Sequence, residues 1–209
     1  SAASDVYKRQ VTSSDGSMPL LAPMSTIAGQ LAFVVGSYHL LKHNNGKGVM
    51  IGQMDNMDPR VVTVIGAGVS GTQSILKAID NNALVKVVDS SQSKLDELKL
   101  QYGSNNVEYI LSTKDSIQSS INDSDLVIGS VYVVGKEAPK VITKEMLSSM
   151  NPGTVMVDVS IDQGGCFETS KPTTHDNPTF LENEIVHYCV TNMPGAVPLT
   201  ATEALNKVT

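Results

Sequence analysis

The chain alternates between short apolar runs and stretches in which apolar residues recur at helical spacing. The runs are rich in β-branched residues and nearly continuous, which is typical of strands buried on both faces of a parallel sheet. Strands and helices that alternate with short connections predict a doubly wound α/β fold. The predicted strands are 61–65, 85–88, 107–111, 126–134, 155–161 and 185–190, and the helices between them are 72–79, 94–102, 117–121 and 142–150.

An earlier segment has the spacing of a long helix that lies outside this unit. Apolar residues recur every three or four positions from Ser25 to Leu41, and a loop from Ser17 to Pro23 precedes them. Ser25 is the kind of residue that caps a helix N-terminus. We therefore expect a helix that is capped by Ser25 and connects the sheet unit to another domain.

The first strand-to-helix connection carries the sequence GAGVSG, with glycines at Gly66, Gly68 and Gly71. In a dinucleotide-binding turn the first glycine permits the tight turn, the second lets a pyrophosphate approach the backbone, and the third allows close packing of helix on strand. The start of the next helix then offers unpaired N–H groups to the phosphates. The motif in this context predicts a Rossmann turn that binds a dinucleotide.

Asp89 ends the next predicted strand, where a carboxylate binds the hydroxyls of the adenosine ribose. The same carboxylate would repel a 2′-phosphate, so we expect NAD as the cofactor rather than NADP.

Two further aspartates lie in or just after the strand predicted over 155–161. Asp162 falls at the carboxyl edge of the sheet, where ligands bind in open α/β folds. Two interpretations are open: it orients the nicotinamide ribose or handles a proton near the reacting carbon, or it hydrogen-bonds the turn at Gly164 and Gly165. Asp158, inside the strand, must be paired or hydrogen-bonded if ionised, which favours a structural role.

Composition narrows the class of partner. The hydrophobic share is 41% and the charged share 17%, as in a folded globular protein. The net charge of −6 argues against nucleic acid or an anionic membrane as partner, and no stretch reaches the roughly 18 apolar residues of a membrane span. Cys166 and Cys189 are expected to be buried free thiols, which favours the cytoplasm. His39 and His43 are expected to be an exposed pair, with no third ligand to form a metal site.

Several segments resemble the alanine dehydrogenase family: PLLAPMSTIAGQLA, VIGAGVSGT, VDVSIDQGGCFET, KPTTHDNPTF and YCVTNMPGAVP. The resemblance extends from Val11 to Thr209. It implies an enzyme that uses NAD to deaminate L-alanine oxidatively to pyruvate and ammonium, built from two domains around a central helix and assembled as a hexamer. It also implies that Asp162 is catalytic, which favours the first of the two interpretations above. Position 94 departs slightly from the family's pattern, because it is a lysine here and commonly an arginine in relatives.

The resemblance also implies contacts with the cofactor beyond the turn. Together with the turn residues Gly66, Ala67, Gly68, Val69 and Gly71, the candidate cofactor-binding residues are Ser25, Asp89, Lys94, Ser112, Val131, Tyr132, Val159, Asp162, Val190, Asn192 and Met193.

The expected domain organisation follows from these segments. We expect a non-native tail over 1–10, a loop and interdomain helix over 11–42, a Rossmann NAD-binding domain over 43–195, and the start of a helix that returns to a substrate domain over 196–209. The family's substrate-binding arginine, lysine and histidine are expected to precede the residues present here. The 209 residues alone are therefore expected to bind NAD weakly and not to turn over alanine.

Two other functions are compatible with the fold. One is the NAD-binding domain of a proton-translocating nicotinamide nucleotide transhydrogenase, which shares the glycine motif. The other is a non-catalytic module that senses NAD, which would not need Asp162. The segments around Asp162 and Asn192 favour the dehydrogenase.

Overall fold

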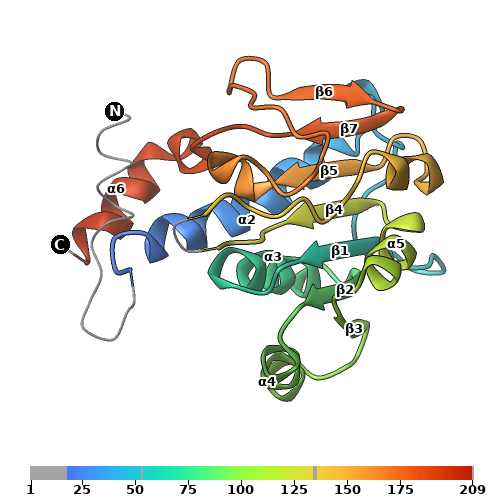
Figure 1. Ribbon diagram of the computed structural model, residues 1–209, viewed down its shortest axis with the longest axis horizontal. Helices are drawn as coiled ribbons and strands as arrows, with labels where there is room; N and C mark the ends of the chain where they lie inside the picture. Colours follow the sequence, from blue (N-terminus) through green and yellow to red (C-terminus); the bar gives the residue numbers. More distant parts are fainter. Residues whose placement is uncertain (1–17, 53, 134–135, 209) are drawn as a thin grey trace.

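The computed structural model describes residues 18–52, 54–133 and 136–208, so the tail expected over 1–10 lies outside the described residues. The described chain contains a seven-stranded sheet in the order β3-β2-β1-β4-β5-β7-β6, in which only the β6–β7 pair is antiparallel (Figure 1). The predicted doubly wound α/β fold is confirmed. The strands are β1 (Val61–Ile65), β2 (Leu84–Asp89), β3 (Val107–Leu111), β4 (Leu126–Gly129), β5 (Val155–Asp158), β6 (Thr179–Glu182) and β7 (Ile185–Tyr188).

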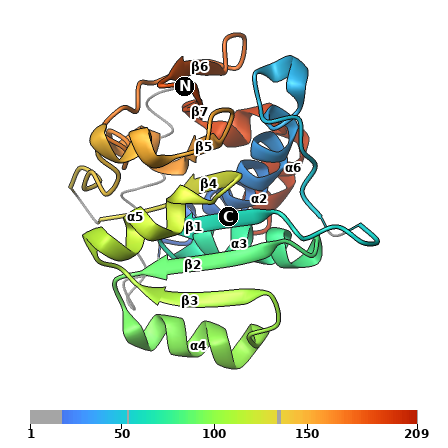
Figure 2. The same cartoon turned by 90° about the vertical axis from the view of Figure 1, so that its right-hand side faces the viewer.

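Helices cover both faces of the sheet (Figure 2). The α-helices are α2 (Ala22–His39), α3 (Val69–Asp80), α4 (Gln92–Tyr102), α5 (Lys114–Asn122) and α6 (Pro198–Asn206). Short 3₁₀ helices are η1 (Lys42–Asn44), η2 (Glu145–Ser149), η3 (Val159–Gln163) and η4 (Met193–Ala196). No helix among the described residues has both the length and the apolar character needed to cross a membrane.

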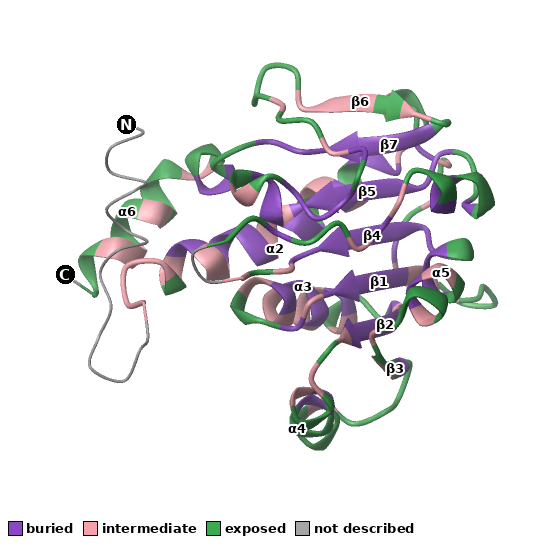
Figure 3. Cartoon of the chain, in the orientation of Figure 1, coloured by how far each residue is buried: buried purple, intermediate pink, exposed green. Residues whose placement is uncertain are grey.

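The core is divided by the sheet, because successive residues of a strand point to opposite faces. Val62 and Val64 of β1 belong to a cluster with residues of α2, α3 and α4, whereas Ile65 belongs to a second cluster with residues of α5 and η2. The inner strands are buried on both sides, and β6 at the edge is not (Figure 3). This explains why the inner strands have continuous apolar runs in the sequence.

The long helix begins earlier than predicted, and its cap is not Ser25. α2 starts at Ala22, with Leu21 at the N-cap position and Pro23 in the first turn. Proline is favoured there because its fixed φ suits the helix and its missing N–H has no partner to lose. Ser25 therefore lies inside the helix, where its side chain faces a cavity instead of capping.

Three predicted strands end earlier than expected. β4 pairs with its neighbours only as far as Gly129, β5 ends at Asp158, and β7 ends at Tyr188. The apolar run continues past β4 and β5 because Val131 and Val159 pack against the core clusters without belonging to the sheet. A run of apolar residues therefore indicates which residues are buried, and not how far the strand pairs with its neighbours.

Two further elements differ from the prediction. The helix expected over 142–150 is only the 3₁₀ helix η2, since Ile142 instead forms a bridge with Phe167. β6 was not predicted, because prolines and asparagines surround it. It joins β7 through a hairpin turn at Asn183 and Glu184, whose φ angles of 50° and 60° are those of a tight hairpin turn.

The cysteine prediction is confirmed and the histidine prediction is wrong in part. Cys166 and Cys189 are free and buried. His43 is exposed, but His39 is buried and packs against Tyr188, so the two do not form an exposed pair. The imidazole of His39 is polar, but its position on the apolar face of α2 determines that it is buried.

Candidate nucleotide groove

The turn after β1 depends on its glycines in three different ways. Gly66 has a φ of +92°, and a Cβ there would lie 2.5 Å from the Ser130 carbonyl oxygen. A Cβ on Gly71 would lie 1.8 Å from the Gly66 carbonyl oxygen, so this glycine permits α3 to pack on the turn. A Cβ on Gly68 would meet nothing within 4 Å. Gly68 therefore leaves a bare backbone facing open space at the start of α3.

Asp89 is fixed beside this turn at the end of β2. Its carboxylate accepts hydrogen bonds from the backbone N–H groups of Ala67, at 2.6 Å, and of Ser91, at 2.8 Å. The side chain thus connects the glycine turn to the neighbouring strand and lies at the edge of a cavity. Lys94, in the first turn of α4, pairs with Glu97 at 3.1 Å and does not line that cavity.

The cavity above the turn has a volume of about 670 Å³ and extends across the carboxyl ends of β1, β2 and β4. Its position is the point where the strand order reverses, because β1 pairs with β2 on one side and with β4 on the other. Its lining residues include Ser25, Gly66, Gly68, Val69, Asp89, Ser112, Val131 and Tyr132.

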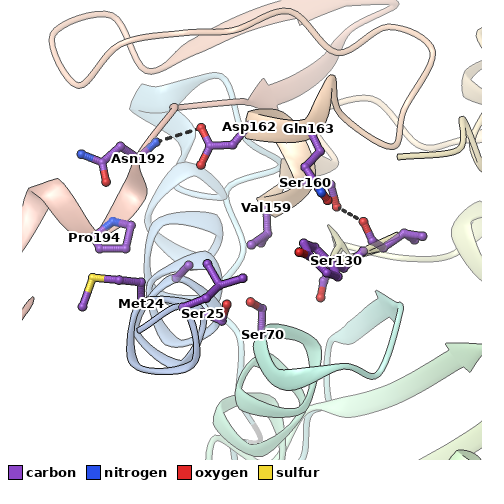
Figure 4. A pocket seen from close by; sticks show the side chains of 14 residues that line it. Met24, Ser25, Ser70, Ser130, Val159, Ser160, Asp162, Gln163, Asn192 and Pro194 are labelled. Atoms are coloured by element: carbon purple, nitrogen blue, oxygen red, sulfur yellow. Dashed lines mark hydrogen bonds between the residues drawn. The ribbon is translucent and has the colours of Figure 1, made fainter. Parts of the chain in front are cut away.

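A second, smaller cavity of about 100 Å³ continues the first and lies between α2, α3 and η3 (Figure 4). We call the two cavities together the groove. They share the residues Leu21, Ser25, Ser70, Ser130, Val131 and Tyr132. The smaller cavity adds Val159, Asp162 and Asn192 at its far side.

Asp162 lies in η3, directly after β5, and points toward Asn192 (Figure 4). Its Oδ1 accepts a hydrogen bond from the Asn192 backbone N–H at 3.3 Å. Asn192 itself has a φ of 51°, so the chain turns sharply at this contact. The segments after β5 and after β7 therefore meet at the carboxylate that the sequence singled out.

The two thiols near this region are not suited to nucleophilic chemistry. Burial raises the pKa of Cys166 well above its usual value and, with the nearby Asp158 charge, raises the pKa of Cys189 to about 12. Both remain protonated at neutral pH, and the thiolate is the nucleophilic form. In the described ranges, no group of three His, Cys, Asp or Glu side chains lies together in a way that could hold a metal ion.

The structure brings most of the predicted site residues to the groove, but not all of them. Ala67 contributes its backbone N–H to Asp89, and Gly71 contributes close packing of α3. Val190 and Met193 are buried in the core cluster beneath the groove, and neither lines it. Five predicted site residues therefore do not line the groove: Ala67, Gly71, Lys94, Val190 and Met193.

Several polar wall residues were not predicted. Ser70 lies in the glycine motif at a variable position, and Ser130 directly follows β4 at the carboxyl edge of the sheet. Ser160 and Gln163 flank Asp162 in η3. Ser130 could have been predicted from its position, because it directly follows β4, a strand that borders the point where the strand order reverses.

The sequence of this chain matches a known family model. Residues 32–209 match the model described as alanine dehydrogenase/PNT, C-terminal domain. The chain belongs to this family.

Proteins similar to the chain agree with the match. The alanine dehydrogenase of Halomonas elongata is 46% identical over 209 residues, which are 100% of this chain and 56% of that protein. The alanine dehydrogenase of Mycobacterium tuberculosis is 42% identical over 210 residues, with the same shares covered. The chain thus spans about half the length of these curated relatives.

Solved structures give the same result for the fold. A structure titled L-alanine dehydrogenase superposes with a TM-score of 0.91 at 41% identity, over 95% of this chain and 55% of that one. A transhydrogenase from Sinorhizobium meliloti has a TM-score of 0.77 at 22% identity, over 90% of this chain and 54% of that one. At that identity the second likeness supports the shared fold alone.

Proposed function

We propose that this family member binds NAD along the groove and forms the cofactor-binding part of an enzyme that oxidises L-alanine to pyruvate and ammonium. The observation that carries the proposal is the geometry of the groove. A glycine turn and a fixed carboxylate lie at one end, and Asp162 lies at the other. The names of the relatives, both alanine dehydrogenases, support the choice of substrate.

The residues at the turn fit a dinucleotide. Gly68 exposes backbone at the N-terminus of α3 where a Cβ would stand in open space, and this is where a pyrophosphate accepts hydrogen bonds from N–H groups. Asp89 at the cavity edge suits the two hydroxyls of the adenosine ribose. Ser112, on the same cavity, would face the adenine side, and Val131 and Tyr132 would line the middle of the groove.

At the other end, Ser25, Val159, Asp162 and Asn192 would surround the nicotinamide. When bound, NAD supplies the acceptor for the hydride that leaves the alanine Cα. Asp162 would hold and move a proton at the substrate amine or at the water that replaces it, because its carboxylate is the acidic group on this wall. Its contact with the Asn192 N–H would orient it for that work. Three predicted residues would contribute without lining the groove: Lys94 through its charge, and Val190 and Met193 by packing beneath the lining residues.

Several finer features belong to the same proposal. We propose a two-domain protein in which α2 connects the domains, a hexameric assembly, and a cytoplasmic location, with the domain limits given by the sequence. We also propose that the 209 residues alone bind NAD without turning over alanine, since a substrate must be held against the nicotinamide. Sedimentation of the full-length protein tests the assembly.

Two assays test the function. The 209-residue chain is titrated with NADH by calorimetry, and the full-length protein is assayed for alanine-dependent reduction of NAD. We expect binding in the first and NADH formation in the second. Absence of alanine oxidation, combined with hydride transfer between NADPH and NAD, would favour a transhydrogenase. Binding of NADH without any turnover would favour a sensing module.

A further inference from the structure

A buried carboxyl group lies directly beneath the loop that carries Asp162. Asp158 is the last residue of β5, and its side chain is 0% exposed. Within the described part of the chain no cation forms an ion pair with it. Burial raises its pKa, and the hydrogen bonds that it accepts oppose the increase. A carboxyl group in such a place costs stability unless its oxygens are well satisfied.

The oxygens of Asp158 are satisfied by both ends of the same loop. At the start of the loop, Oδ1 accepts a hydrogen bond from the Ser160 N–H at 2.9 Å. At the end, Oδ2 accepts from the Cys166 N–H at 2.8 Å and from the Phe167 N–H at 3.4 Å. The Ser170 hydroxyl donates to the same oxygen. One side chain therefore joins the two ends of the segment 159–165.

The segment between these ends is tightly constrained. Gly164 and Gly165 both have positive φ angles, of +86° and +77°, and a Cβ on Gly165 would lie 2.7 Å from Asp158 Oδ2. The Lys140 ammonium donates to both glycine carbonyl oxygens. The Ser160 hydroxyl donates to the Val131 carbonyl oxygen at 2.8 Å, which links the segment to the wall of the groove.

We propose that Asp158 is a positioning residue, which closes residues 159–165 into a fixed loop and so determines where the Asp162 carboxylate lies in the groove. The turnover assay of this inference rests on the proposed function. The structural claim, that Asp158 fixes the loop, does not depend on that function. A role in stability alone would require only an acceptor for these donors, whereas this acceptor also joins both ends of the loop that carries Asp162. An ionised carboxylate is suited to gather several N–H and O–H donors around one point.

The main test uses Asp158→Asn in the full-length protein. The amide nitrogen cannot accept a hydrogen bond, so one end of the loop loses its partner. We expect kcat for alanine oxidation to fall about 100-fold, as for a misplacement of about 1 Å. The affinity for ADP-ribose, which would lie at the turn, Asp89 and Ser112 and away from Asp162, should change less than about threefold.

A double-mutant cycle decides whether Asp158 acts through Asp162. In an Asp162→Asn background, adding Asp158→Asn should lower kcat by less than about threefold, because the group that it positions is already gone. A merely structural role predicts instead that the two effects multiply. Multiplicative losses, or an ADP-ribose affinity that falls as much as kcat, would overturn the proposal.

A milder pair of variants covers the case in which Asp158→Asn does not fold. Ser170→Ala removes one half-buried donor to Asp158, and Ser120→Ala removes a more deeply buried hydroxyl, which lies in α5 and donates to the Ser116 carbonyl oxygen. We expect Ser170→Ala to lower kcat about tenfold, by the loss of one hydrogen bond to a charged group. Ser120→Ala should leave kcat unchanged.

Amide hydrogen exchange supplies a readout that needs no substrate. In Ser170→Ala, exchange should become faster at residues 160–167 and remain unchanged in the glycine turn. If exchange responds in this way but alanine is not oxidised by the wild type, the proposed function fails and the positioning role stands. If alanine is oxidised and residues 160–167 exchange at the wild-type rate, the positioning role fails alone.

Discussion

The two ends of the groove are built in different ways. At the turn end, the glycine turn and its carboxylate come from one continuous piece of sequence, Gly66 to Asp89, and the turn leaves bare backbone facing the cavity. The end with Asp162 is assembled from α2 and from the segments after β4, β5 and β7, and it presents side chains. On the proposed function, a local motif would be enough to hold the phosphates, whereas the proposed reacting group is supported by several segments distant in the sequence. Binding and catalysis are expected to divide between the two ends in the same way.

The largest expected effect is on catalysis, at the end of the groove that contains Asp162. Asp162→Asn in the full-length protein should lower kcat for alanine oxidation about 1,000-fold, within the range that general acid–base groups contribute. The dissociation constant for NADH, measured by fluorescence titration, should change less than about threefold. A variant that keeps its turnover would remove Asp162 from the catalytic role.

The glycines of the turn give a matched pair. Gly71→Ala should lower the free energy of unfolding by about 3 kcal/mol, because its Cβ collides with the Gly66 carbonyl oxygen. Gly68→Ala should change it by less than about 1 kcal/mol, since nothing lies near that Cβ. Instead its NADH affinity should fall about 10- to 100-fold, because the methyl group takes the place of the pyrophosphate. Chemical denaturation and NADH titration of both variants test the pair, and equal losses of stability would contradict it.

A smaller effect is expected at the ribose carboxylate. Asp89→Asn should weaken NADH binding about tenfold through the loss of a charged acceptor. It should also narrow the preference for NADH over NADPH, because the repulsion of a 2′-phosphate is gone. The matched control is Asp96→Asn on the exposed side of α4, where the carboxylate accepts from Gln92 one turn away. An unchanged coenzyme preference would mean that Asp89 does not face the ribose.

The smallest effect concerns the stability of the protein at low pH, and it arises from His187 in β7. His187 is buried, its Nδ1 donates to the Ile185 carbonyl oxygen at 3.1 Å, and its Nε2 accepts from the Thr169 hydroxyl at 2.8 Å. Burial lowers the pKa of His187 below 6.5, so the unfolded chain binds a proton more readily than the folded one. The free energy of unfolding should therefore fall as the pH falls through 6.5. His187→Gln should reduce this dependence in urea denaturation at a series of pH values, and an identical pH dependence would contradict it.

The parts that could be predicted from sequence are those whose cause is local. The glycine turn, Asp89 and the inner strands depend on backbone conformation and on burial, and both leave a pattern in neighbouring residues. Asp162 could be found by its position after a strand, although its catalytic interpretation needed a family resemblance.

The parts that could not be predicted depend on contacts between distant segments. Val131 looks like a strand residue but lines the groove, and β6 exists only because β7 supplies a pairing edge. The hydrogen bonds from Ser170 to Asp158 and from Lys140 to the glycine carbonyls join residues that no spacing rule connects. His39 was expected at the surface and is buried, because Tyr188 of a distant strand covers it.

A crystal structure with bound NADH tests the central claim most directly, namely that one dinucleotide spans both ends of the groove. The account predicts the adenosine ribose at Asp89, the pyrophosphate over Gly68 and the nicotinamide between Ser25 and Asp162. A dinucleotide bound in the reverse direction, or one whose nicotinamide lies away from Asp162, would contradict it.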